Sequence, residues 1–344
     1  MVGSELKTIS IADIITQTTR TSEVTGQKVR DIRQVTAKLR ILALNALIEA
    51  KHAGDKGAGF SVVADEVRAI SSEVEGLAKN LGDEISKLNT LTHDMVEHSQ
   101  GMRLTDLALN AIEIIDRNLY ERTCDVRWWA TDAAVVQQAC TPSHDQQAFT
   151  NERLGVILGS YTVYLDLWLC DLQGNIIANG RPSLYPVTGQ NVSNREWFKR
   201  ALNLHSGEDY TVADVESEPL LQGNLTATYA AGVRAEGKSR GALAGVLGIH
   251  FDWQPQARTV VEGVRLTPEE RTRTRVLLTD AKGLVLAASD GRGLLQERIN
   301  LRHQNRLSGS YTDEKGQLIA FHKTPGYETY PGLGWYGVLI QKPA

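Results

Sequence analysis

The chain has 344 residues, of which 42 % are hydrophobic and 23 % are charged, as is ordinary for a soluble protein, and its length allows two or more domains. Its formal net charge of −4 gives no support to nucleic-acid binding. Cys124, Cys140 and Cys170 are isolated, without a C-x-x-C pair, so we expect a reducing compartment and neither a disulfide framework nor a zinc site.

Residues 4–53 are predicted to form the first arm of a helical hairpin. The threonine-rich segment 16–25 and Gly26 weaken an isolated helix, so this arm should depend on partner helices. Its apolar positions include Ile11, Ile15, Val24, Val29, Ile32, Val35, Leu39 and Leu42.

Gly54, Gly57 and Gly59 lie between two helix-favouring patterns and indicate a tight reversal of the chain. The second arm then shows alternating spacings of three and four over about five heptads, which predicts a supercoiled helix, although an ordinary helical hairpin is the alternative. Two arms of equal length, roughly 75 Å each, would assemble as a dimeric four-helix bundle, because one hairpin buries only part of each apolar seam. The heptad residues are Val67, Val74, Leu81, Leu88, Met95 and Met102, with Ile70, Leu77 and Leu91.

Residues 41–68 read ILALNALIEAKHAGDKGAGFSVVADEVR. This run resembles the signalling tip of methyl-accepting chemotaxis proteins. The resemblance implies a receptor tip that contacts a histidine kinase and its coupling protein, and that packs against neighbouring chemoreceptor dimers. The tip residues expected at the kinase and coupling-protein contact are Leu44, Asn45, Glu49, Val62 and Val63.

Several positions depart from the family pattern. Ala37 stands where the family carries a bulky apolar residue, Arg40 replaces a usual asparagine, and His52 and Ala58 replace usual arginines. These positions belong to the surface used between dimers or for the kinase, so ordinary trimer packing does not follow from the resemblance. No paired Glu/Gln segment supports methylation.

No stretch approaches about 18 uninterrupted apolar residues, so we expect no membrane span, and the first ten residues lack the pattern of a secretory signal. Most chemoreceptors sense outside and signal inside. We therefore expect both halves of this chain to lie in the cytoplasm.

A long helix is predicted over residues 104–140, because no Pro or Gly separates Met102 from Cys140 and the coiled coil should continue directly into it. Residues 125–129 could form a binding cluster, but a helix that docks Trp128 and Trp129 on a sheet is favoured. The apolar residues expected on one face are Leu107, Ile114, Ile115, Leu119, Val126, Trp129, Val135 and Val136.

The rest of the chain reads as strands. Residues 161–169 and 176–178 flank a turn at 171–175, which predicts a hairpin, and residues 275–289 repeat that pattern about 110 residues later. Further strands are predicted at 209–215, 225–234, 242–252, 318–323 and 335–340. We therefore expect an α+β fold with a hairpin over 1–103 and a second domain over 104–344, in which antiparallel sheet units occupy 151–262 and 270–344.

The segment Asn194–Ala201, NREWFKRA, is followed by Tyr210 and the strand that contains Gly245–Gly248. Over roughly residues 104–343 the chain resembles a double Cache domain, an extracellular-type sensor built from a long helix and two PAS-like sheets. In amino-acid-sensing members an Arg and a Trp bind the ligand carboxylate, and a strand Asp binds its ammonium. The resemblance places the first two roles on Arg195 and Trp197.

The residue chemistry favours a particular ligand. A guanidinium matches a carboxylate in bidentate geometry, an indole adds an N–H donor, and aromatic walls exclude water. His250 replaces the family's strand Asp and Asp252 follows on the same strand face, so we expect a small carboxylate without an ammonium, or a ligand that meets a neutral imidazole. The alternative is that Arg195 and Trp197 only stabilise the domain. The full expected ligand set is Arg195, Trp197, Phe198, Tyr210, His250, Asp252 and Trp168.

Two hypotheses for function follow. The first is a soluble chemoreceptor-like homodimer in which a small organic ligand controls a kinase through the hairpin, and the second is a structural module that joins receptor arrays without sensing. An enzyme is least supported, since there is no Gly-rich phosphate loop, metal-ligand spacing or nucleophile elbow, and no cofactor is expected.

Overall fold

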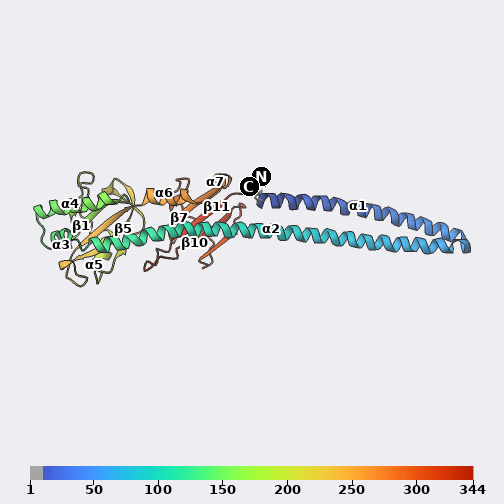
Figure 1. Ribbon diagram of the computed structural model, residues 1–344, viewed down its shortest axis with the longest axis horizontal. Coiled ribbons are helices and arrows are strands. Elements are labelled where there is room, and N and C mark those ends of the chain that lie inside the picture. Colours follow the sequence, from blue (N-terminus) through green and yellow to red (C-terminus); the bar gives the residue numbers. More distant parts are fainter. Residues whose placement is uncertain (1–10, 344) are drawn as a thin grey trace, which may run out of the picture. The chain divides into compact units, whose positions relative to one another are not determined.

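The computed structural model describes residues 11–343, so the first seven residues of the expected first arm lie outside the described residues. By its internal contacts the chain divides into a hairpin unit that extends to Gln100 and a sheet unit that starts at Gly101. Figure 1 labels the elements in chain order. Long helices followed by two antiparallel sheets confirm the expected α+β class.

The hairpin unit consists of α1 (Ile11–His52), a 3-10 turn η1 (Gly54–Gly57) and the first part of α2 (Ala58–Trp129). Gly54 has a φ of 62°, which a glycine adopts without steric cost. A Cβ on Gly57 would lie 2.0 Å from the Ala50 carbonyl oxygen, so only glycine lets the reversal close this tightly. The reversal predicted from the glycines is confirmed.

The contact between the two arms uses small side chains at seven-residue spacing. The buried positions are Val29, Thr36, Ala43 and Ala50 on α1, with Ala64, Ser71 and Ala78 on α2. The larger heptad residues Ile70, Leu77 and Leu91 are 51 %, 61 % and 65 % exposed. As expected, one hairpin buries only part of its apolar surface.

The predicted helix over 104–140 is wrong in its second part. α2 ends at Trp129, and α3 (Ala133–Cys140) begins after a turn in which Asp132 Oδ1 accepts a hydrogen bond from Ala134 N at 2.9 Å. This N-cap satisfies a free helix N–H and starts a new helix without Pro or Gly. Trp129 is buried against the rings of Tyr161 and Tyr164, whereas Trp128 is 69 % exposed, so only one of the two tryptophans docks.

The first sheet has the strand order β2-β1-β6-β5-β3, with β4 paired to β5. Its inner face packs on α2, α3 and the unanticipated helix α4 (His144–Ser160), and its outer face packs on α5 (Glu196–Leu202). The expected strand 209–215 shortens to two residues, and β4 was not expected. The strands are β1 (Tyr164–Cys170), β2 (Ile176–Asn179), β3 (Thr211–Val212), β4 (Glu216–Glu218), β5 (Asn224–Arg234) and β6 (Leu243–Asp252), with 3-10 turns at Pro219–Leu221 and Ala235–Gly237.

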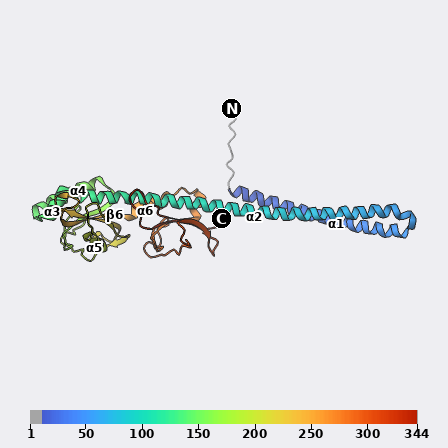
Figure 2. The ribbon, with the colours of Figure 1, turned by 90° about the horizontal axis from the view of Figure 1, so that it is seen from below.

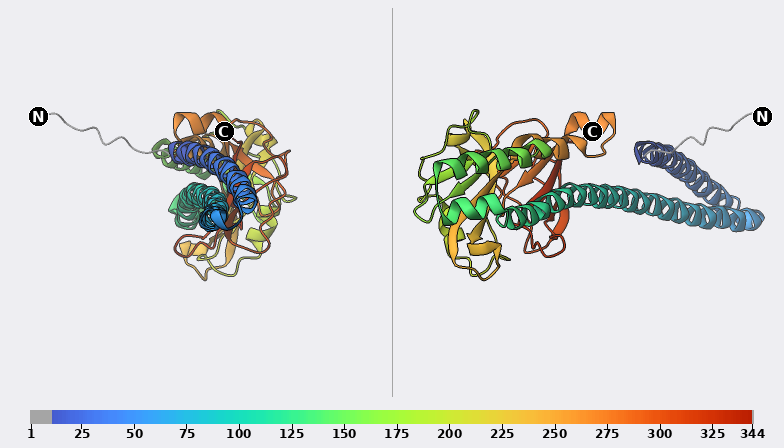
Figure 3. Two further views of the ribbon diagram at one scale, coloured as in Figure 1. Left: turned by 90° about the vertical axis from the view of Figure 1, so that its right-hand side faces the viewer. Right: turned by 60° about the vertical axis from the view of Figure 1, so that its left-hand side comes forward.

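The second sheet has the order β8-β7-β11-β10-β9, which is the same arrangement of successive strands as in the first sheet. The helix α6 (Trp253–Gly263) follows β6 and leads toward this sheet through α7 (Pro268–Arg273) (Figure 3). The helices α6 and α7 and the strand β9 were not expected from the sequence. The strands are β7 (Thr274–Thr279), β8 (Val285–Ala288), β9 (Ser308–Thr312), β10 (Leu318–Lys323) and β11 (Tyr336–Gln341).

The internal repeat predicted from the sequence is confirmed in the opening hairpins of both sheets. Asp171 Oδ1 accepts from the backbone N of Gln173 and Asn175 at 2.9 and 2.8 Å, and Asp280 Oδ1 accepts from Lys282 and Leu284 N at 2.7 Å each. Each turn then has a glycine at positive φ, 85° at Gly174 and 81° at Gly283. The carboxylate fixes the turn and the glycine adopts the left-handed angle that it needs.

Within the sheet unit, both sheets follow one another along α2 (Figure 2). One face of α2 enters the core of the unit with Leu104, Ala108, Ala111, Ile112, Ile115, Leu119 and Val126. Ile114, which was expected on this face, is exposed. No helix among residues 11–343 is long and apolar enough to span a membrane.

We predict that Gly337→Ala destabilises the sheet unit, because a Cβ there would lie 2.2 Å from the Ala108 carbonyl oxygen of α2. Such overpacking typically costs about 1–3 kcal/mol. Urea unfolding of the full chain measures the loss. Gly159→Ala, on the last turn of α4 with no heavy atom within 4 Å of the added Cβ, is the matched control and should be neutral or stabilising. Equal stability of both variants would contradict the tight contact.

Candidate ligand-binding site

The candidate site lies on the outer face of the first sheet, under α5. Arg195 is the N-cap residue of this short helix, and Trp197, Phe198 and Ala201 form its buried side. On β6, alternation directs Gly248 and His250 to the same face. The Trp197 ring covers Gly248, where an added Cβ would approach it to 3.1 Å, so the glycine leaves room for the indole.

Four of the expected ligand residues form one buried aromatic cluster. The His250 ring lies 3.8 Å from that of Trp168 and 5.8 Å from that of Trp197 between centroids, and Trp197 meets Phe198 edge to face at 5.9 Å. All four side chains are at most 1 % exposed. The structure therefore brings together residues that are separated by up to 82 positions in sequence, in a closed arrangement.

The His250 imidazole is neutral at pH 7. Burial, together with the Arg195 charge, lowers the pKa of His250 from 6.5 to about 3. Nδ1 is hydrogen-bonded to Thr228 Oγ1 at 3.1 Å. The structure therefore provides the neutral imidazole that the expected ligand would meet.

Three buried polar atoms of this region have no hydrogen-bond partner among the described residues. They are Nε1 of Trp197, Nε2 of His250 and Oγ1 of Thr226, and each side chain is at most 1 % exposed. A buried polar group without a partner costs about 1–3 kcal/mol. All three belong to the outer face of the first sheet or to α5, which covers it, so they are the donors and acceptors that a ligand could use.

Arg195 has a partner that the sequence did not indicate. Its Nη2 donates to Oε1 of Glu218 at 2.7 Å, and Glu218 is almost fully buried. The same oxygen accepts from Leu220 N at 3.0 Å, which fixes the carboxylate at the end of β4. Burial raises the pKa of the neighbouring Glu216, against the opposing charge of Arg195. The expected carboxylate-binding arginine is thus already paired with a carboxylate.

The other two expected residues differ in position. Asp252 lies on the outer face two residues after His250, and burial raises its pKa against the charge of Arg181. Tyr210 is stacked on Tyr229 at 6.4 Å and lies beneath the Arg127 guanidinium at 5.5 Å, on the inner face that packs on α2. The structure therefore does not bring Tyr210 to the Trp197 cluster.

A buried carboxylate that the sequence analysis missed holds the cluster in place. Asp166 accepts from Nε1 of Trp168 at 3.0 Å, from Nδ2 of Asn179 at 2.8 Å and from the backbone N of Arg181 at 3.0 Å. Burial raises the pKa of Asp166, while these hydrogen bonds oppose the rise. The sequence did offer one signal for this residue. Asp166 stands inside the apolar run that forms β1, where a carboxylate must be buried.

The hairpin tip presents the expected contact residues to solvent. Leu44, Val62 and Val63 are exposed hydrophobic residues, and Asn45 and Glu49 are exposed as well. Arg40, one of the departures from the family pattern, lies 3.8 Å from Glu75 on the opposite arm. The tip is therefore available for partners, while Arg40 contributes an ion pair within the hairpin.

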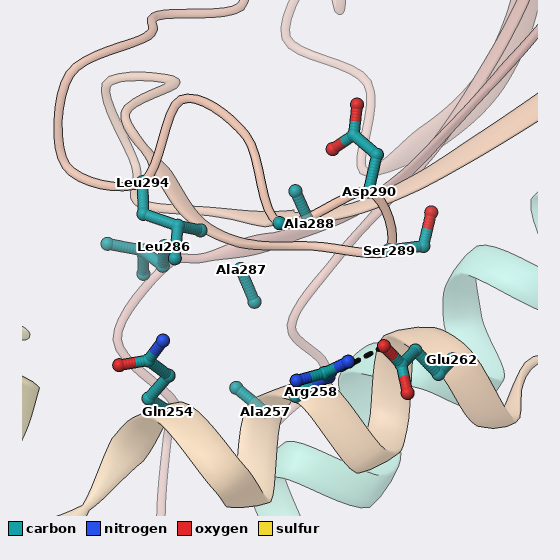
Figure 4. Close-up of a pocket in the computed structure, with 11 residues that line it drawn as sticks. Gln254, Ala257, Arg258, Glu262, Leu286, Ala287, Ala288, Ser289, Asp290 and Leu294 are labelled. Carbon is teal, nitrogen blue, oxygen red and sulfur yellow. Dashed lines mark hydrogen bonds and ion pairs between the residues drawn. The ribbon is translucent and has the colours of Figure 1, made fainter.

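The second sheet unit contains cavities that the sequence did not predict, and two of them share part of their lining. A pocket of about 220 Å³ lies between α6 and β8. Figure 4 shows Arg258 and Glu262 joined on α6, and the Asp290 carboxylate turned away from that helix. A larger cavity of about 1030 Å³ adjoins it and shares Glu262, Ser289 and Asp290. Among the described residues no cluster of three or more His, Cys, Asp or Glu side chains is arranged for a metal ion.

Residues 6–141 match the family of methyl-accepting chemotaxis protein (MCP) signalling domains, which confirms the resemblance of the hairpin. Biofilm dispersion protein BdlA of Pseudomonas aeruginosa is 42 % identical over 72 residues, 21 % of this chain and 17 % of that protein. Methyl-accepting chemotaxis protein TlpQ of the same organism is 38 % identical over 87 residues, 25 % of this chain and 12 % of that protein. The matched part thus spans less than a fifth of these relatives' length.

The sheet unit resembles solved sensor domains. The ligand-binding domain of the amino acid chemoreceptor PctC of Pseudomonas aeruginosa PAO1, in complex with GABA, has a TM-score of 0.51 at 17 % identity and covers 70 % of this chain and 98 % of that one. The sensory domain of the Campylobacter jejuni chemoreceptor Tlp3 has a TM-score of 0.52 at 17 % identity, with 72 % and 94 % covered. These likenesses show the fold, a double Cache arrangement, as the sequence predicted.

We predict that His250 makes folding stability pH-dependent. Because its pKa is about 3 when folded and about 6.5 when unfolded, the unfolded chain binds the additional proton between these values. Its contribution to the free energy of unfolding is fully present above pH 6.5 and is lost as the pH falls toward 3. At pH 5 the loss is about 2 kcal/mol. Chemical unfolding at pH 7 and pH 5 measures the difference, which should shrink in His250→Gln.

The control is His205→Gln. Because His205 is exposed, this substitution removes no buried imidazole. This variant should keep the pH dependence of the parent chain. If His250→Gln instead loses as much stability between pH 7 and pH 5 as the parent does, the buried neutral imidazole is not the cause.

Proposed function

We propose that this chain is a chemoreceptor-like signal transducer. Its Cache-type sheet unit binds a small organic molecule at the Trp197 cluster, and its hairpin passes the bound state to a histidine kinase and a coupling protein. The observation that carries the proposal is the set of three unpartnered buried polar atoms at Trp197, His250 and Thr226, in a chain that also exposes a chemoreceptor-type tip.

The physical support for a ligand at this site is the cost of leaving those atoms unpaired. A ligand that accepts from the indole N–H of Trp197 and bonds to Nε2 of His250 would recover part of that cost. The cluster is closed, with Trp168, Phe198 and His250 fully buried, so binding requires Trp197 or α5 to move. A ligand that favours the opened arrangement shifts the population toward it.

The ligand class follows from the charges around the cluster. The carboxylate expected from the sequence would have to share Arg195 with Glu218, whose position is fixed by Leu220 N. We propose a small polar ligand that meets the neutral imidazole, and a carboxylate only where it uses the guanidinium donors that Glu218 leaves. Asp252 lies on the same face and supplies a further acceptor.

A contiguous set of contacts leads from this cluster to α2. Thr228 bonds His250 on the outer face, and the next residue, Tyr229, places its hydroxyl 3.4 Å from that of Tyr330 on the inner face. Tyr330 belongs to the loop in which Gly326 N donates to Asp116 Oδ2 of α2 at 2.9 Å. We propose that ligand binding acts on α2 along this route, for which a coupling of about 1–3 kcal/mol is sufficient.

The proposed partners begin with a second copy of this chain. The hairpin seam of one chain uses small residues, and the exposed Ile70, Leu77 and Leu91 continue the heptad period. A second hairpin would cover them in a four-helix bundle. The kinase, the coupling protein and other chemoreceptors are the further partners that the exposed tip suggests.

The second candidate function is a structural module that joins receptor arrays without sensing. Ala37, Arg40 and His52 differ from the family surface, and Arg40 is engaged with Glu75 inside the hairpin. These observations favour altered contacts at the tip.

The cytoplasmic location expected from the sequence is consistent with three free cysteines and stays a prediction, which fractionation of cells expressing the chain would check.

We predict that the full chain, reconstituted with a chemotaxis histidine kinase and coupling protein, changes kinase activity when a metabolite library supplies its ligand. Trp197→Phe removes the indole N–H together with part of the buried ring, and should weaken binding of that ligand at least roughly tenfold, because one buried donor is lost. Calorimetry on the full chain measures the affinity. Arg195→Ala is less informative, since it also leaves the buried Glu218 without its partner.

Trp128→Phe is the matched control, because Trp128 is exposed and should leave affinity unchanged. If Trp197→Phe binds the ligand as tightly as the parent, the cluster is not the site. If no ligand changes kinase activity although the chain joins the array, the structural module is the better description.

We predict that the hairpin drives dimer formation. Leu77→Lys together with Leu91→Lys places charges on the exposed apolar face and should shift the chain to monomer in sedimentation velocity, without unfolding the sheet unit. Leu172→Lys, at an exposed position of the sheet unit, is the control and should remain dimeric. A parent chain that sediments as a monomer at high micromolar concentration would refute the proposed bundle.

A further inference from the structure

The largest cavity described above lies on the outer face of the second sheet, the face that corresponds to the α5 side of the first sheet. We refer to it as the outer groove. Its volume is about 1030 Å³, which is enough for a small organic molecule. It is lined by the end of α7 and the start of β7, by Ile340 and Lys342 at the end of β11, by residue Ile319 of β10 and by the loop 297–300. Val261, Glu262 and Leu266, in and after α6, and Asp313 and Gln317 also line it.

One arginine of the outer groove is paired with two acids. Nε of Arg275, in β7, lies 3.0 Å from Oδ2 of Asp290. Its Nη1 and Nη2 donate to Oε1 and Oε2 of Glu297 at 2.9 and 2.8 Å. These hydrogen bonds lower the pKa of Glu297 and raise that of Arg275. Asp290 and Glu297 are therefore committed to Arg275 and do not neutralise other cations of the groove.

Four further cations of the outer groove have no carboxylate within ion-pair distance among residues 11–343. Three of them donate to backbone carbonyls instead: Arg271 to Glu262 O at 2.8 Å, Arg273 to Lys342 O at 2.9 Å and Arg298 to Lys282 O at 3.3 Å. The fourth is Lys342. The lining of the groove carries five cations and four acids, a net charge of +1, and Arg273 and Lys342 are not paired with any of these acids. The four acids are Glu262, Asp290, Glu297 and Asp313.

Arg273 and Lys342 stand opposite each other where the β7–β11 ladder ends. Lys342 N donates to Arg273 O at 2.9 Å, one step beyond the pair Thr274 and Gln341. Like charges at directly opposed positions are unfavourable. In addition, Nε of Arg273 is buried and has no hydrogen-bond partner among the described residues. An anion between these two side chains would satisfy the free donor and relieve the repulsion.

The outer groove is not purely polar. Ile299, Ile319 and Ile340 belong to or pack against the apolar cluster of this face and line the same cavity. By the period of two, Arg275 shares the face of β7 on which Leu277 packs. Arg273, the last residue of α7, and Lys342, the residue after β11, line the same cavity. Cationic and apolar side chains therefore line one cavity from neighbouring strands.

We propose that the outer groove is a second ligand-binding site, for a small organic anion that carries a carboxylate or a phosphate on a short apolar body. Arg273 and Lys342 bind the anionic group, and Ile299, Ile319 and Ile340 contact the apolar body. The smaller pocket beside α6 does not fit this ligand, because its Arg258 is already paired with Glu262 at 2.7 Å.

The test is an equilibrium titration of the full chain with four six-carbon probes: hexanoate, hexyl phosphate, hexan-1-ol and hexylamine. At least one of the two anions should bind, and the alcohol and the amine should bind at least tenfold more weakly. Tighter binding of hexyl phosphate than of hexanoate, with inorganic phosphate competing against both, would identify the phosphate as the preferred group. Affinity for the anion should fall as salt concentration rises.

Variants then assign the binding to the two cations. Arg273→Gln and Lys342→Gln should each weaken anion binding about tenfold, since a charge-assisted hydrogen bond is lost. Arg273→Lys keeps the charge and should recover part of the affinity. Trp197→Phe, on α5 beside the first sheet, should leave it unchanged, which separates this site from the one proposed above.

Three results would overturn the proposal. They are the absence of binding by both anions at millimolar concentration, equal binding of hexan-1-ol and hexanoate, and unchanged affinity in the double variant Arg273→Gln and Lys342→Gln. Thermal unfolding of each variant without ligand shows whether a loss of affinity comes from a loss of fold, and Arg273→Lys remains a folded comparison if Arg273→Gln does not.

Discussion

The sheet unit depends on one shared packing surface, the face of α2 that carries Ala108, Ile112 and Ile115 into the core. Both sheets place their inner faces against this helix and the core around it. The contact is close enough that Gly337 of β11 admits no side chain over the Ala108 carbonyl. Because protein interiors are densely packed, a displacement of α2 would have to be accommodated by both sheets. The same geometry leaves the outer faces of the two sheets free of α2, and these are the faces on which the two candidate sites lie.

This division between faces also gives the proposed route from the Trp197 cluster, on the outer face of the first sheet, to α2 on its inner face. In β5, Thr228 points outward to His250, while Tyr229 points inward to Tyr330 and the loop that bonds Asp116. Adjacent residues of a strand face opposite sides of a sheet, so a shift of one strand moves both contacts together. The Asp116 carboxylate at the end of this route is buried, and burial raises its pKa against the hydrogen bonds of Thr324 and Gly326.

The parts of the structure that the sequence predicted well are those with local signals. Heptad spacing, the glycine reversal and the repeated Asp-to-Gly turns at Asp171 and Asp280 are each determined within a few residues. The missed features depend on contacts between distant segments. Glu218 lies on a three-residue strand with no usable period, and its pairing with Arg195 joins positions 23 residues apart. Tyr210 was assigned to the site from order along the chain, but the very short β3 gave no indication of its face. The end of α2 was missed because an Asp132 N-cap, and not Pro or Gly, separates it from α3.

The two sheets show that a shared topology does not fix a shared ligand. Both have the same order of successive strands and the same opening turn, and both carry an arginine on the outer side. In the first unit that arginine, Arg195, meets one buried glutamate beside neutral, unpartnered donors. In the second, Arg275 is held by two acids, and Arg273 two residues earlier has no carboxylate partner in the described part of the chain. Function resides in such sites and not in the fold. The charge arrangement accordingly favours a ligand that meets a neutral imidazole in the first unit and an anion in the second, so one α2 would be in contact with two sheets that respond to different molecules.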